Sequence, residues 1–125
     1  MERETPMLDN ADMSVDKILA QEAIPAIGVD DKGDVTSVNG CFTREYGWSR
    51  AELVGKPLTT IIPPAMRETH SVGFSRFLAT EKPRLLGRSL RLPVLFKDGR
   101  ELPAEHFIMA EKQGGTWRLA ALIRR

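Results

Sequence analysis

The sequence predicts an α+β domain with one antiparallel sheet, because hairpin patterns stand on both sides of a helical middle. Short apolar or alternating runs are joined by turns rich in Asp and Gly, which is typical of β-hairpins. The expected strands are residues 26–29 and 35–38 before the helices, and 90–96, 102–110 and 117–123 after them. A length of 125 residues fits a single domain with one core and one pocket.

A polar leader and a short amphipathic helix are expected ahead of the first hairpin. Val15, Ile18 and Leu19 share one stripe at helical spacing, so this helix must dock its apolar face on the rest of the fold. The expected organisation is a flexible leader over residues 1–10, an N-terminal cap helix over 11–23 and the folded domain over 24–125.

Capping signals predict two short helices after the first hairpin. Phe42 and Tyr46 share one face at i,i+4 spacing, and Gly47 stops the first of these helices. Ser49 and Glu52 then form a capping-box pattern, in which the Ser hydroxyl accepts from the backbone and the Glu carboxylate reaches back to the cap. A second helix of about one turn therefore follows Ser49.

A longer helix is expected over residues 64–80, because Pro63 and Pro64 suit the start of a helix. Its apolar stripe consists of Met66, His70, Phe74, Phe77 and Leu78. A neutral imidazole on such a face can hold a metal or a haem. The simpler interpretation is that His70 makes a polar contact at the rim of a pocket without any iron.

Alternation assigns the side chains of the later strands to two faces of the sheet. The pocket face is expected to carry Leu90, Leu92, Val94 and Phe96 from one strand and Leu102, Ala104, His106, Ile108 and Ala110 from the next. The outer face is expected to carry Leu95, Phe107, Met109 and Leu122. Because this outer face is apolar, we expect the cap helix or a second protomer to cover it.

Composition and charge limit the function classes. Lys and Arg total 18 against 17 acidic residues, and a net charge of +1 gives no field that would gather nucleic acid or an anionic membrane surface. The single cysteine, Cys41, excludes an internal disulfide. The N-terminus has no signal-peptide pattern, and no apolar run approaches the roughly 20 residues of a membrane helix, so we expect a cytoplasmic protein.

Catalytic patterns are not visible in the sequence. It contains no Ser/His/Asp set, paired-carboxylate motif, phosphate loop or zinc-ligand spacing. We therefore expect no enzymatic activity from this chain, and any associated kinase or cyclase activity would reside in other domains. The favoured partners are small molecules and proteins.

Two stretches resemble the PAS family: residues 39–57, NGCFTREYGWSRAELVGKP, and residues 96–107, FKDGRELPAEHF. The resemblance extends along nearly the whole chain from about residue 11. It implies the PAS fold, a five-stranded antiparallel sheet of strand order 2-1-5-4-3 with short helices and one longer helix around a ligand pocket. PAS domains sense small molecules, light or redox state, so the resemblance implies a sensory module of signal transduction, as in two-component systems.

Residues 62–77, IPPAMRETHSVGFSRF, are similar to the proximal helix of FixL-type haem-binding PAS domains. By this resemblance His70 is the candidate proximal haem ligand. His106 is the candidate distal group, as a sixth iron ligand, a hydrogen-bond donor to bound gas or a polar group for a different ligand. The pocket lining would include Leu90, Ile108 and Phe74. The FixL types carry a distal arginine where this chain has Leu90, which places an oxygen-stabilising arginine in doubt.

Haem is therefore the cofactor that the resemblance implies, and its iron is the one metal expected. Flavin is not expected, because the LOV motif GxNCRFLQ has no match and Cys41 lies too early in the chain. We expect a homodimer through the cap helix and the outer sheet face, signalling to an output domain in cis or in trans. Neither nucleic acid nor a membrane is an expected partner. The alternative is a cofactor-free PAS domain used for dimerisation or protein–protein interaction.

Overall fold

The computed structural model describes residues 14–80 and 89–125, which form a five-stranded antiparallel sheet flanked by helices. The strands are β1 (Ala26–Asp30), β2 (Val35–Val38), β3 (Ser89–Leu95), β4 (Glu101–Gln113) and β5 (Thr116–Arg124). Their order in the sheet is β2-β1-β5-β4-β3, which confirms the predicted topology. The N-terminal and C-terminal strands β1 and β5 are thus neighbours at the centre of the sheet.

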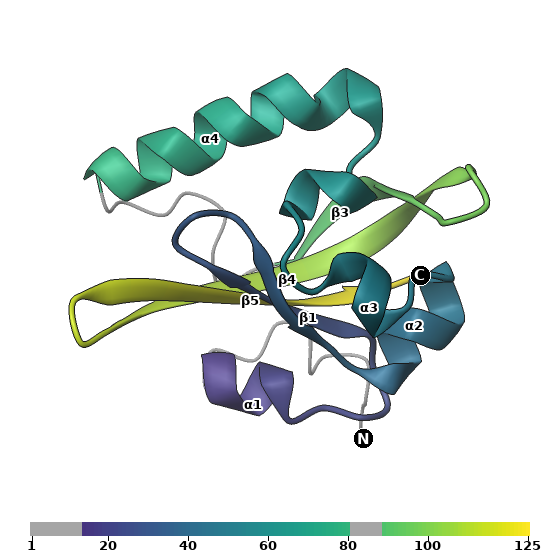
Figure 1. Cartoon of the computed structure of the whole chain (residues 1–125), viewed down its shortest axis with the longest axis horizontal. Coiled ribbons are helices and arrows are strands. Elements are labelled where there is room, and N and C mark those ends of the chain that lie inside the picture. Colours follow the sequence, from purple (N-terminus) through teal and green to yellow (C-terminus); the bar gives the residue numbers. More distant parts are fainter. Residues whose placement is uncertain (1–13, 81–88) are drawn as a thin grey trace.

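The helices lie on both faces of the sheet. They are α1 (Val15–Leu19), α2 (Gly40–Tyr46), α3 (Arg50–Leu53), the 3₁₀ helices η2 (Leu58–Ile61) and η3 (Pro64–Met66), and α4 (Arg67–Thr80). Figure 1 shows α1 alone on one face, and α4 spanning the opposite face at some height above the strands. The long helix begins as predicted after the two prolines, with one 3₁₀ turn before the α-helix.

The hairpins are joined by turns rich in Asp and Gly, as the sequence predicts, and two of these turns show why glycine is needed there. In the β1–β2 turn, the Asp30 carboxylate accepts from the backbone N–H groups of Lys32 at 2.9 Å and Asp34 at 3.0 Å. Gly33 then has a φ of 85°. The turn between β3 and β4 places Gly99 at a φ of 96°. Because side chains other than glycine rarely adopt such angles, these two glycines fix where the strands reverse.

Asn39 joins β1, α2 and the segment between α1 and β1 through four hydrogen bonds. Its carbonyl oxygen accepts from the N–H groups of Phe42 at 2.9 Å and Ala26 at 3.1 Å. Its amide nitrogen donates to the carbonyls of Gln21 at 2.9 Å and Ile24 at 2.8 Å. The helix α1 ends at Leu19, earlier than the predicted end at residue 23, because the following carbonyls turn toward Asn39.

The predicted capping box forms at the start of α3. The Ser49 hydroxyl accepts from the N–H of Glu52 at 3.1 Å, and the Glu52 carboxylate accepts from the N–H of Ser49 at 2.9 Å. Gly47 ends α2 in the left-handed conformation, with a φ of 87°. The short central helices are therefore specified locally, by caps at each end.

Two apolar cores are separated by the sheet, as the alternation predicts. The core on the α2 and α3 side contains Ile27, Val35, Val38, Phe42, Tyr46, Leu53, Ile61, Val94, Phe96, Ala104 and Ile123. The core on the α1 side contains Val15, Ile18, Ile24, Ala26, Phe107, Ala120 and Leu122, with Leu19 and Met109 packed against it. The apolar stripe of α1 therefore packs on the outer face of the sheet of the same chain.

Polar contacts reinforce the docking of α1 on the outer sheet face. The N–H of Val15 donates to the Glu111 carboxylate at 3.1 Å, and Arg118 pairs with Asp16 at 2.8 Å. Phe107 and Leu122 are completely buried beneath the helix. The predicted leader, residues 1–10, lies outside the described residues.

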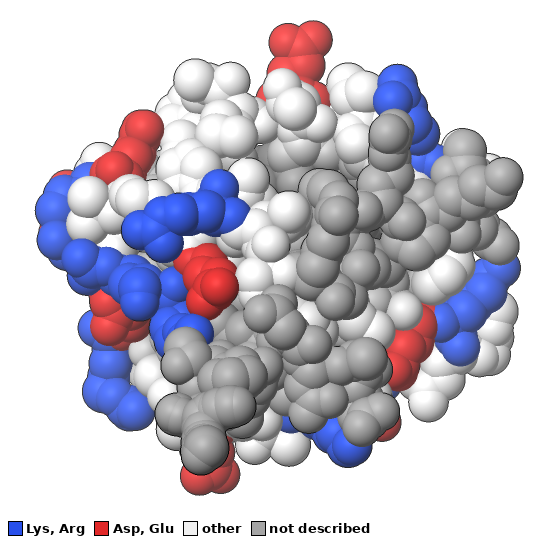
Figure 2. Space-filling model, turned by 180° about the vertical axis from the view of Figure 1, so that it is seen from behind, with Lys and Arg blue, Asp and Glu red and all other residues white. Residues whose placement is uncertain are grey.

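Charges on the surface are mixed in sign. Figure 2 shows basic and acidic side chains interspersed over the described part of one face. Several are paired across elements, such as Arg124 with Glu105 at 3.0 Å. Among residues 14–80 and 89–125, no helix is long and apolar enough to cross a membrane.

Candidate functional site

A cavity of about 750 Å³ lies between α4 and the sheet. This volume is within the range of roughly 300–1,000 Å³ that is typical of small-molecule and cofactor sites. Its described lining consists of Ile27, Val29, Leu58, Ile61, Ile62, Met66, Thr69, His70, Gly73, Phe74, Arg76, Phe77, Leu92, Pro93, His106, Ile108, Leu119, Ala120, Ala121 and Ile123. Most of these side chains are apolar, and two of them are imidazoles.

The helix α4 roofs the cavity, and separate contacts hold it away from the strands. At its start, the Arg67 guanidinium Nε donates to the carbonyls of Thr59 at 3.0 Å and Ile62 at 2.9 Å. Farther along, Phe77 packs edge-on against Trp117 of β5, with ring centroids 4.8 Å apart. The helix is thus fixed near both ends, which leaves space between its middle and the sheet.

Phe74 adds a contact between α4 and the first hairpin. A Cβ built on Gly33 would lie 3.6 Å from the Phe74 ring, which places the ring directly over the β1–β2 turn. The rings of Phe74 and His70 are nearly parallel, at 21°, with centroids 6.1 Å apart. The Phe74 ring therefore lies between the imidazole and the hairpin and closes one side of the cavity.

His70 lines the cavity from the roof. Burial lowers the pKa of His70 below its usual value of 6.5. Its imidazole is therefore neutral at pH 7, with a lone pair on one ring nitrogen. A neutral imidazole of this kind is the form that ligates haem iron.

His106 lines the cavity from the sheet, and a backbone hydrogen bond fixes its ring. The Nδ1 atom lies 3.0 Å from the carbonyl oxygen of Ala104, and because a carbonyl only accepts, Nδ1 carries the proton. Burial lowers the pKa of His106, although the bond to Ala104 acts in the opposite direction. The ring is therefore neutral at pH 7, and Nε2 has a lone pair and no proton.

The predicted site residues meet at this cavity with one difference. The candidate ligand His70, the candidate distal group His106, and Phe74 and Ile108 all line it. Leu90 lies opposite His106 in the β3–β4 ladder and shares its face, but β3 contributes Leu92 and Pro93 to the lining instead. The register also leaves Arg91 exposed, so this arginine does not supply a distal group.

Other lining residues were not singled out from the sequence. Alternation along β1 and β5 would have found Ile27, Val29, Leu119, Ala121 and Ile123. The 3₁₀ segment contributes Leu58 and Ile61, which carry no periodic signal. Thr69 and Arg76 of α4 bring the remaining described polar side chains to the cavity.

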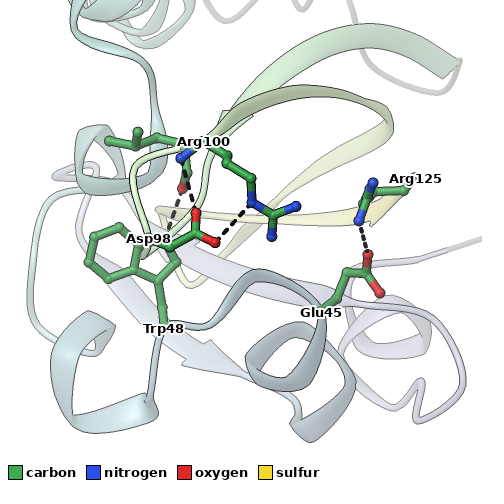
Figure 3. Close-up of polar contacts among 6 residues, drawn as sticks. Glu45, Trp48, Asp98, Arg100 and Arg125 are labelled. Carbon is green, nitrogen blue, oxygen red and sulfur yellow. Dashed lines mark hydrogen bonds and ion pairs between the residues drawn. The ribbon is translucent and has the colours of Figure 1, made fainter.

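The C-terminal end of β5 is tied to α2 beside the cavity core. The Tyr46 hydroxyl donates to the carbonyl of Ile123 at 2.7 Å, and Arg125 pairs with Glu45 at 3.0 Å. Arg125 also lies over the Phe96 ring, 5.3 Å from its centroid. Figure 3 shows the Glu45–Arg125 pair next to the β3–β4 turn, where Arg100 and Asp98 form a second ion pair. Ile123 also lines the cavity, so the same residue contacts both the cavity and α2.

A five-stranded antiparallel sheet of this order, with a ligand-sized cavity beneath a single long helix, defines the class of PAS sensory domains. The family model described as PAS fold matches residues 14–109, and the chain belongs to the PAS family. Domains of this family usually serve as sensory signalling modules rather than as catalysts.

The chain is also similar to individual proteins and to a solved structure. The chain is 29% identical over 114 residues to an uncharacterized protein of Azorhizobium caulinodans, and 27% identical over 89 residues to the sensor protein FixL of Bradyrhizobium diazoefficiens. These matches cover 90% and 71% of this chain but only 14% and 17% of the relatives. The PAS domain of a Desulfitobacterium hafniense protein matches in structure with a TM-score of 0.65 at 22% identity, covering 85% of this chain and 95% of that one.

Proposed function

We propose that this PAS domain is a sensor that binds a small ligand or cofactor in the cavity beneath α4 and signals its occupancy through the sheet. The observation that carries the proposal is the cavity itself. It offers about 750 Å³ of mainly apolar space with neutral imidazoles on two opposing elements, His70 on α4 and His106 on β4. An apolar pocket with a few convergent polar groups is typical of ligand sites.

Haem is the specific cofactor that the residues fit. His70 would hold the iron as proximal ligand, because its neutral imidazole lines the cavity from the helix that resembles the FixL proximal helix. Arg76 brings a guanidinium to the same lining, where it would meet an anionic group of the cofactor. When bound, haem would supply an iron centre that responds to a diatomic gas or to redox state.

Transmission would pass from the cavity to the outer face of the sheet. Ile123 and Ala121 line the cavity from β5, whereas Leu122 between them is buried under α1. If a change in cavity occupancy shifts β5, it would therefore also shift the sheet surface on which α1 packs. We propose that α1 and the outer sheet face form a homodimer interface, whose two arrangements are biased by the occupant, and that an output domain follows in cis or in trans.

Hemin titration tests the haem proposal. We expect the wild-type chain to give a sharp Soret band with one equivalent of hemin. His70→Ala should lose this band, whereas His106→Ala should retain haem and change only its spin state if His106 is a distal ligand. A broad band in all three proteins, equal to that of free or non-specific hemin, would contradict haem as the cofactor.

A second candidate function is dimerisation without any cofactor. It is favoured by Leu19 and Met109, which pack only partly buried at the edge of the α1 core and leave apolar surface at the rim. Changing both to charged residues should convert a dimer into a monomer in light scattering. An unchanged dimer would place the interface elsewhere, and a wild-type monomer would contradict dimerisation by this domain alone.

A further inference from the structure

The sheet wall of the cavity carries a single polar side chain among the described residues, that of His106. Its cross-strand neighbours are Leu90 on β3 and Ile123 on β5, and Ile108 follows on the same face. The other described polar side chains of the lining, Thr69, His70 and Arg76, all belong to α4. His106 is therefore a polar group set in an apolar wall.

The hydrogen bond to Ala104 determines what this group offers to an occupant. With Nδ1–H directed at the carbonyl, 3.0 Å away, the atom left for the cavity is Nε2, which can only give its lone pair. Among residues 14–80 and 89–125, no hydrogen bond to Nε2 is formed. Nε2 is thus an acceptor without a donor among the described residues, in a mainly apolar wall, so an occupant that supplies a donor at this position gains from pairing with it.

We propose that His106 determines which ligands bind in the cavity. The preferred ligand has an apolar body and a group that accepts an electron pair from Nε2. This inference rests on the proposed ligand-binding function and specifies its ligand class. The accepting group is an N–H or O–H donor in an organic ligand, or the iron of haem. A ring in this state has no Nε2 proton to offer a bound gas, so His106 would act as a lone-pair donor and not as an oxygen-stabilising hydrogen-bond donor.

Indole and indene test the organic form of the proposal, because the two bicyclic probes have nearly the same shape and only indole carries an N–H. Their dissociation constants are measured by NMR titration of the full chain. We expect the ratio of indole to indene affinity to fall by about fivefold in His106→Leu relative to wild type, the loss of one net hydrogen bond. His106→Gln keeps an acceptor and should retain part of the ratio.

Ile108→Leu is the matched control, since it alters the same apolar wall without touching the acceptor. Because Ile108 lines the cavity, both affinities can change with the shape of the wall, but their ratio should stay within about twofold of the wild-type ratio, since the acceptor is unchanged. If wild type and His106→Leu bind both probes with the same ratio, and hemin spectra of the two proteins also agree, the role of His106 is wrong while the cavity remains a ligand site. If neither probe nor hemin binds the wild type, the proposed function fails and this inference with it.

The iron form is distinguished by hemin. A low-spin spectrum in the wild type that becomes high-spin in His106→Leu, but not in Ile108→Leu, identifies iron as the accepting group. Should His106→Leu fail to fold, nitrogen-15 NMR of the wild-type imidazole gives an independent answer. We expect the shifts of a ring protonated at Nδ1 and unprotonated at Nε2, and the opposite tautomer would overturn the proposal.

Discussion

The Tyr46 hydroxyl donates a 2.7 Å hydrogen bond to the carbonyl of Ile123, whose side chain lines the cavity. The two residues lie 77 positions apart in the chain, and the bond is buried. Burial raises the pKa of the Tyr46 hydroxyl far above its usual value, so this group stays protonated and remains a donor. This hydrogen bond connects α2 with β5, whose side chains line the cavity.

Tyr46→Phe should therefore lower the free energy of unfolding by about 1 kcal/mol, because it removes the donor and leaves the Ile123 carbonyl without this partner. Urea denaturation measures the change, and the m-value should stay constant because the buried surface hardly changes. An unfolding free energy equal to that of the wild type would show that the bond contributes nothing to the tie between α2 and β5.

Asn39→Ala should be more destabilising, by about 2 kcal/mol or more, since four hydrogen bonds to β1, to α2 and to the segment before β1 are lost together. Ser14→Ala is the matched control, because Ser14 makes one N-cap hydrogen bond, to the N–H of Lys17, and its loss should cost about 1 kcal/mol or less. Thermal melts compare the two variants. Equal losses would contradict the role of Asn39 as a junction.

Gly73→Ala should stabilise the ligand-free domain by about 0.5–1 kcal/mol. Gly73 lies within α4, where glycine is less favourable than alanine, and a Cβ at this position would meet no atom within 4 Å. Because Gly73 lines the cavity, the added methyl group should also weaken binding of any ligand that packs against the helix. Chemical denaturation with and without a bound probe separates the two effects, and a loss of stability in the ligand-free protein would contradict an open cavity here.

Stability should decrease as the pH falls below about 6.5. The folded-state pKa values of His70 and His106 are lowered by burial, so the unfolded chain binds more protons between the folded-state pKa and the usual value of 6.5. Their contribution is complete above this window and is lost as the pH falls through it. Melting temperatures at pH 7.5 and 5.5 measure the effect, and His106→Leu should show a smaller difference than the wild type. An equal difference would mean that His106 is not neutral in the folded state.

Local sequence signals were sufficient for much of the fold. The Ser49–Glu52 capping box and the helix end at Gly47 depend on residues within a few positions of one another, and both formed as predicted. Alternation placed Phe107 and His106 on opposite faces of β4 in the same way. The order of the strands came from the resemblance to PAS domains, because neighbouring strands β1 and β5 are about 90 residues apart.

The site was harder to predict, because its chemistry depends on contacts that no sequence pattern encodes. The sequence analysis predicted that His70 and His106 line one pocket. The hydrogen bond from Nδ1 of His106 to Ala104, which fixes the tautomer, is visible only in the folded structure. Leu90 shares the face of His106, yet β3 contributes Leu92 and Pro93 to the described lining instead. The end of α1 at Leu19 likewise follows from the distant Asn39.

The central claim, that the space beneath α4 is a ligand site, is tested most directly by methyl NMR of the full chain during titration with hemin and with indole. We predict that shifts or line broadening concentrate on the methyl groups of Ile108, Leu119 and Ile123, which line the cavity, and that Met109 on the outer face is little affected. Perturbations confined to Met109 and its neighbours, or the absence of any change with both probes, would contradict the claim.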